Sequence, residues 1–118
     1  MSAETSGQRL RETFDQALDR ASQQLGKRMV WDERELEALN AAAGATDRRD
    51  DLQRVYADEL TGDRRPGILV KLSAEIRLLD KAVADHLARV RIGPGIAKSE
   101  RHQRAVNARW QRHREMNA

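Results

Sequence analysis

The residues best suited to bind a ligand are gathered in the last quarter of the sequence, where cations surround one aromatic side chain. Residues 93–118 contain six Lys or Arg and two Glu, a net charge of +4, whereas residues 1–92 carry 16 cations and 17 carboxylates. Cationic side chains can neutralise phosphates, and an indole can stack on a base. The predicted nucleic-acid-binding residues are Lys98, Arg101, Arg104, Arg109, Trp110, Arg112 and Arg114.

Two other interpretations of this basic segment stay open. In a helix Arg101, Arg104 and Arg112 would share one face. Such a face could contact an acidic protein surface as well as a phosphate backbone. It could also serve only as a soluble end of the chain. Charge alone does not separate these possibilities.

Patterns typical of catalysis or metal binding are incomplete in this sequence. The stretch GPGIAKS at residues 93–99 resembles part of a phosphate-binding P-loop, but Ala97 replaces the glycine before Lys98. His102 and His113 lack the i, i+4 spacing of two zinc ligands on one helix. Acidic residues are plentiful, but nothing in the sequence places a carboxylate pair in an apolar pocket, where a raised pKa would suit it to general acid catalysis. We therefore expect a non-catalytic protein without cofactor or metal.

The composition favours long, solvated helices as the elements that position this segment. Charged residues make up 35% of the 118 residues and aromatic residues 3%, so few bulky side chains are present for a globular core. Cysteine is absent, which excludes disulfides. No apolar run approaches the roughly 20 residues of a membrane span, and the N-terminus has no signal-peptide pattern. These features predict a soluble, intracellular protein that does not enter a membrane.

The stretch Ile68–Arg91 has the clearest helical periodicity in the chain. Its large apolar residues recur at the a and d positions of a heptad, and neither Gly nor Pro interrupts them. Such a seam requires a partner helix, within the chain or in another copy. The predicted core and oligomer interface residues are Leu69, Leu72, Ile76, Leu79, Val83 and Leu87, with Val90 continuing the seam.

Two further helices are predicted before this one. Residues 1–7 are small and polar and are expected to be disordered, and a first amphipathic helix should span 8–25 and end at Gly26. Asp32 and Glu35 form a capping-box pattern, with Trp31 and Leu36 spaced as a hydrophobic staple, so a second helix should span 32–61. Its middle should be weak, because Gly44 and five consecutive charges interrupt the stripe. Residues 61–67 should turn the chain into a third helix, 67–91.

The predicted organisation is an N-terminal arm (1–30), a helical-hairpin oligomerisation core (31–92) and a basic, partly flexible tail (93–118). We expect Leu52, Val55 and Tyr56 of one hairpin arm to face Leu72 and Ile76 of the other. Gly93-Pro94-Gly95 should act as a hinge before the tail.

Three stretches together resemble the small terminase subunits of tailed phages that infect actinobacteria. They are WDERELEALNAAAGATDRRDDLQ from Trp31, LSAEIRLLDKAVADHL from Leu72 and KSERHQRAVNARW, which ends at Trp110. The resemblance implies a DNA-packaging protein in the cytoplasm of an infected actinobacterial cell. Such a protein forms a ring, recognises double-stranded phage DNA and delivers it to the large terminase subunit, which carries the ATPase and nuclease.

The chain departs from this family at its N-terminus. Many small terminases carry an N-terminal helix-turn-helix domain, but here the connection after Gly26 is too long for one. Glu33, Glu35 and Glu37 would also repel phosphates from the start of the following helix. DNA contact is therefore expected in the tail.

The sequence thus predicts an all-α, non-enzymatic protein in which an N-terminal helix and a long antiparallel helical hairpin form homo-oligomers with a basic C-terminal tail. Two alternatives remain. One is a helical-hairpin scaffold or adaptor whose tail docks on an acidic protein, and the other is a small dimeric DNA-binding regulator.

Overall fold

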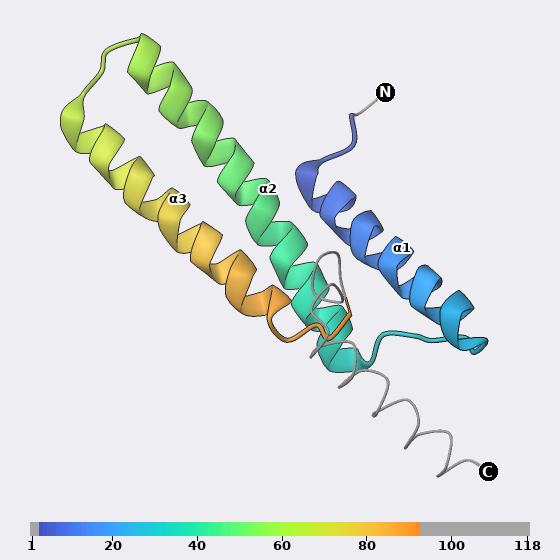
Figure 1. The fold of residues 1–118 in the computed structure, drawn as a ribbon. Coiled ribbons are helices and arrows are strands. Elements are labelled where there is room, and N and C mark those ends of the chain that lie inside the picture. The colour runs from blue at the N-terminus through green and yellow to red at the C-terminus, as the bar shows by residue number, and fades with distance from the viewer. Residues whose placement is uncertain (1–2, 93–118) are drawn as a thin grey trace. The chain divides into compact units, whose positions relative to one another are not determined.

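A computed structural model of the protein describes residues 3–92, and these residues form helices and connecting segments without a strand. The helices are α1 (Ser6–Leu25), α2 (Glu33–Thr61) and α3 (Pro66–Leu87) (Figure 1). The predicted all-α class is confirmed for this part of the chain. Between residues 3 and 92, no helix has the length and apolar character needed to span a membrane.

The described residues divide into two compact units. The hairpin unit comprises residues 3–12 and 31–90, and the second unit comprises residues 13–30 with 91–92. The first turns of α1 therefore belong with α2 and α3, whereas the remainder of α1 belongs to the second unit.

The start of α1 corrects the expectation that residues 1–7 are disordered, because residues 3–7 are placed and Ser6 begins the helix. Thr5 caps it: the Gln8 N–H donates to Thr5 Oγ1 at 3.1 Å, and the Thr5 N–H donates to Gln8 Oε1 at 2.8 Å. This reciprocal pair is a capping box. The sequence contains this T-x-x-Q pattern at residues 5–8, but the small polar composition of residues 1–7 predicted disorder instead.

The end of α1 lies within the second unit and follows the prediction. Gly26 has a positive φ of 62°, its N–H donates to Gln23 O at 3.2 Å, and the Lys27 N–H donates to Ser22 O at 3.1 Å. These two bonds form a Schellman motif, which glycine favours because it has no Cβ. The Ser22 hydroxyl also accepts from the Met29 N–H at 3.0 Å, which fixes the segment that follows.

Helix α2 begins where the capping pattern predicted. The Asp32 carboxylate accepts from the Glu35 N–H at 2.7 Å, and the Asp32 N–H donates back to the Glu35 side chain at 3.3 Å. The preceding Trp31 is buried. The helix continues through Gly44, and the buried Thr46 hydroxyl donates to the Ala42 carbonyl at 2.8 Å. The predicted weak middle does not interrupt the helix.

Helices α2 and α3 pack as an antiparallel hairpin (Figure 1). Pro66 occupies the first turn of α3, where the missing N–H costs nothing. The helix ends at Leu87, four residues before the predicted end. Arg89 and Val90 instead make i→i−3 bonds to His86 O and Leu87 O, which tighten the chain into a turn. Val90 is buried just beyond the helix, although the sequence placed it on the helical seam.

Candidate assembly interface

The predicted nucleic-acid-binding residues lie outside the described residues. These are Lys98, Arg101, Arg104, Arg109, Trp110, Arg112 and Arg114, and the Gly93-Pro94-Gly95 hinge lies outside as well. The structure therefore places the other predicted site, the apolar seam of α3, together with the residues around it.

The seam is best packed in the part of the hairpin that is far from the α2–α3 loop. There Val83 forms a buried cluster with Ala42 and Ala45 of α2. Leu79 and Leu87 are partly buried against this cluster, and so is Leu10 from the first turns of α1. Alanines at the contact allow the helices to approach closely, and Leu10 covers the cluster as a third element. The sequence did not predict this role for Leu10.

The half of the hairpin near the loop, residues 47–78, is packed much less tightly, and we call it the distal arm. Glu59 is its only buried residue. The seam residues Leu69, Leu72 and Ile76 are each half-buried there. Three residues from α2, which are Leu52, Tyr56 and Leu60, are half-buried as well. Two helices alone thus leave this apolar stripe partly accessible to water.

Val55 departs from the predicted packing. The sequence placed it in the hairpin contact with Leu52 and Tyr56, but its side chain is 48% exposed. In a helix, consecutive residues are separated by about 100°. Val55 therefore points about a quarter turn away from Tyr56, on a different face of α2.

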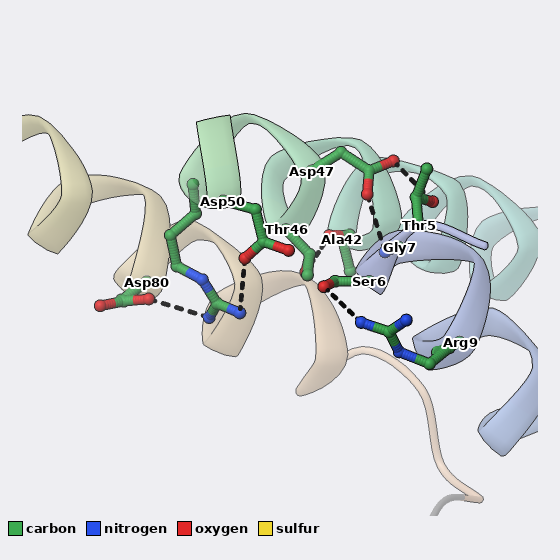
Figure 2. A network of polar contacts seen from close by, with 10 residues as sticks. Thr5, Ser6, Gly7, Arg9, Ala42, Thr46, Asp47, Asp50 and Asp80 are labelled. Atoms are coloured by element: carbon green, nitrogen blue, oxygen red, sulfur yellow. Dashed lines mark hydrogen bonds and ion pairs between the residues drawn. The ribbon is translucent and has the colours of Figure 1, made fainter. Parts of the chain in front are cut away.

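A network of polar contacts lies at the inner end of the distal arm (Figure 2). The Arg49 guanidinium reaches from α2 to Asp80 of α3, with Nη1 3.0 Å from Oδ1, and it lies 3.9 Å from Asp50. The Arg49 Nε is buried and has no hydrogen-bond partner among the described residues. Figure 2 shows Asp47 on the other side of α2, directed at the first turn of α1.

Asp47 joins α1 to α2 through its carboxylate. Oδ1 accepts from the Gly7 N–H at 2.8 Å, and Oδ2 accepts from the Thr5 hydroxyl at 3.3 Å. Gly7 is required for this approach, because a Cβ there would overlap the Ala43 carbonyl oxygen. Further along, the Arg11 side chain donates to Asn40 Oδ1 at 2.6 Å. The charged middle of α2 therefore binds both of its neighbouring elements.

The loop of the hairpin is fixed by the buried Glu59. Its carboxylate accepts from the Arg65 backbone N–H at 3.1 Å, from Arg65 Nε at 3.1 Å and from Nη2 at 2.5 Å. The hydrogen bonds from the Arg65 side chain, followed by the one from its backbone, lower the pKa of Glu59 below its ordinary value. Arg64 adopts the left-handed region at φ 50°, and its N–H donates to Glu59 O at 2.8 Å.

His86 lies near the end of α3 and is half-buried. Its Nδ1 is buried and has no hydrogen-bond partner in the part of the chain that the structure describes. His102 and His113 are outside that part.

Comparison with known proteins gives no match for the chain among protein-family models, curated proteins or solved structures.

Proposed function

We propose that the chain is a non-catalytic, self-assembling DNA-binding protein that acts as the small subunit of a phage terminase. In this role it forms a ring, binds the phage genome in the cytoplasm of the infected cell and delivers the DNA to the large subunit. The resemblance of three sequence stretches to actinobacterial phage small terminases supports the terminase assignment.

The observation that carries the assembly part of the proposal is the packing of the distal arm. Its apolar stripe is long and regular, yet none of its apolar side chains is buried. Small folds without disulfides or structural metals commonly obtain missing burial by oligomerisation. A neighbouring copy would cover the half-buried stripe along both of its edges. The seam residues would then pack both against the other helix of the hairpin and against the neighbouring copy.

The charge distribution supports the DNA-binding part. An excess of cations in residues 93–118 follows residues 1–92, whose 16 cations and 17 carboxylates nearly balance. In a ring, each copy contributes one such segment, so a weak contact is multiplied by effective concentration. Neutralising about six phosphates per segment also makes the affinity depend steeply on salt.

The test is a titration of duplex DNA at about 50 and about 200 mM salt, with the full chain and with a chain that ends at Ile92. We expect the full chain to bind more tightly and with a steeper salt dependence. A full-length variant with Arg101, Arg104, Arg109 and Arg112 changed to Gln serves as the control, since it removes charge and keeps the length. Equal affinity of all three proteins would exclude the basic segment as the DNA contact.

The scaffold or adaptor remains the second candidate, because half-buried apolar residues and a basic end would serve a protein partner equally. Absence of DNA binding by the full chain at low salt would favour it. The mass in solution tests the third candidate: a stable dimer would favour the small regulator, whereas a larger closed oligomer supports the ring.

A further inference from the structure

Helix α3 carries a second apolar row on the side that faces away from α2. Val70, Ala74 and Leu78 are spaced i, i+4 and i+8, so they share one face. Ala74 lies about half a turn around the helix from the seam residue Ile76. The side chains of Val70 and Leu78 are 68% and 58% exposed. Large apolar side chains that are exposed on one face indicate an interaction surface.

Two cations flank this row. Lys71 and Arg77 lie on its two sides and are exposed. Neither side chain has an ion-pair or hydrogen-bond partner among residues 3–92. We call Val70, Lys71, Ala74, Arg77 and Leu78 the basic row. Its chemistry suits a surface that combines one apolar side chain with two carboxylates.

Helix α2 of the same chain carries a surface of that composition. Asp51, Val55 and Asp58 are exposed at i, i+4 and i+7, so one apolar side chain lies between two carboxylates, and we call them the acidic row. Asp51 contacts Arg54 within the helix, whereas the Asp58 carboxylate has no partner in the described part of the chain.

The two rows also match in position along the hairpin. Asp58 lies in the last turn of α2, and Lys71 lies in the second turn of α3, both near the loop. Asp51 and Arg77 each lie about three turns from the loop. Val55 lies between Asp51 and Asp58 along α2, and its distance from the loop is about the same as that of the small Ala74 in α3. Two hairpins whose distal arms lie side by side in the same orientation, beyond the α2 residues that contact α1, would therefore bring opposite charges together at both ends, with Val55 over Ala74.

We propose that the basic row of one copy binds the acidic row of the next copy, so that the hairpins associate head to tail through α3 and α2. This interface rests on the proposed function, because it specifies the contact by which the ring forms. The contact is heterologous, since it joins two different surfaces of the same chain. Interfaces of this kind form closed rings when the rotation between copies closes.

The arrangement favours a second copy over an unrelated partner as the occupant. Both complementary rows come from one chain, and a head-to-tail array covers both of them in every copy. A two-fold symmetric dimer formed through either row alone would instead place that row against itself and oppose like charges.

The test uses charge reversal in the full chain. One variant carries Lys71→Asp and Arg77→Asp, and a second carries Asp51→Lys and Asp58→Lys. Because all four residues are exposed, both variants should keep the helical circular dichroism of the parent. Each variant alone opposes like charges at every contact, and we expect the dissociation constant for assembly to rise at least about tenfold. A variant with Arg20→Asp and Arg34→Asp makes the same charge change outside the rows and should assemble normally.

Mixing the two variants gives the decisive result. In an equimolar mixture each basic face of one variant meets an acidic face of the other, so alternating copies should assemble as the parent does. Normal assembly of either variant alone, or failure of the mixture to assemble while each variant remains folded, would overturn the proposed interface.

The same measurement separates this inference from the proposed function. If the parent forms a large oligomer but the charge variants assemble equally well, the ring stands and the two rows are not its contact. If the parent is a monomer at micromolar concentration, both the ring and this interface are wrong, whereas DNA binding by the tail is tested independently by the chain that ends at Ile92.

Discussion

The backbone N–H of Gly7 donates to Oδ1 of Asp47 at 2.8 Å and so joins the first turn of α1 to the middle of α2. The first turn of α1 contains no acidic residue of its own. Asp47 therefore supplies, from another helix, the acceptor and negative charge that a helix N-terminus favours. One of the five charges that predicted a weak middle in α2 thus holds the first turn of α1 against α2 within the hairpin unit.

Replacing Asp47 tests this attachment. Asp47→Ala should lower the free energy of unfolding by about 1 kcal/mol, which is typical for loss of a helix cap. It should also speed hydrogen exchange at Gly7 and Gln8. Asp47→Asn keeps an oxygen acceptor and should lose less. Urea unfolding and amide exchange measure both effects, and equal stability of Asp47→Ala and the parent would show that the contact contributes nothing.

Two glycines should respond to alanine in opposite directions. At Gly7 a Cβ would overlap the Ala43 carbonyl oxygen and lie 2.7 Å from Asp47 Oδ2, so Gly7→Ala should push α1 away from α2 and destabilise the protein. At Gly44, in the middle of α2, nothing lies within 4 Å of an added Cβ. Gly44→Ala should therefore raise the free energy of unfolding by about 1 kcal/mol. Thermal unfolding of both variants decides this, and stabilisation by Gly7→Ala would exclude the close approach.

The sequence alone was sufficient to predict structural features that depend on residues close together in the chain. The capping box of Asp32 and Glu35 and the left-handed Gly26 were predicted because each depends on residues within one turn of a helix end. The contacts of Asp47 with Gly7 and of Leu10 with the Ala42 cluster were not predicted. They join residues far apart in sequence, and no periodicity encodes which helix faces which.

Val55 shows the same limit within a single helix. Its i+3 spacing from Leu52 predicted that it continues the stripe, but the contact face of α2 passes through Leu52 and Tyr56 and leaves Val55 exposed. Only the position of α3 determines which of two adjacent apolar residues is covered. The apolar residues of the basic row recur in the sequence at i, i+4 and i+8, but the heptad seam on the opposite face of α3 has the stronger periodicity and dominated the prediction.

The Glu59–Arg65 contact should make the stability depend on pH. The pKa of Glu59 is lowered in the folded protein, so the unfolded chain binds more protons between the lowered value and the ordinary one. This stabilisation is present above the ordinary pKa of Glu and is lost as the pH falls through the folded value. Glu59→Gln should therefore be less stable than the parent at about pH 7 and more nearly equal to it at about pH 3. Urea midpoints at the two pH values measure this, and a constant difference between the proteins would contradict it.

Substitutions at Leu79 and Leu72 test the well-packed and the loosely packed halves of the seam separately. Leu79 packs against the buried Ala42, Ala45 and Val83, whereas Leu72 is half-buried in the distal arm. In dilute protein, Leu79→Asp should lower the free energy of unfolding by about 2–3 kcal/mol, because a carboxylate without a partner is placed against the core.

Leu72→Asp should cost clearly less in the isolated chain, because water still reaches that side chain. At concentrations where the parent assembles, however, both variants should fail to form the oligomer, Leu79→Asp through loss of the fold and Leu72→Asp with its helices retained. Urea unfolding, circular dichroism and solution mass separate the two cases. A Leu72→Asp variant that assembles as the parent does would show that the stripe of the distal arm is not covered by a neighbouring copy.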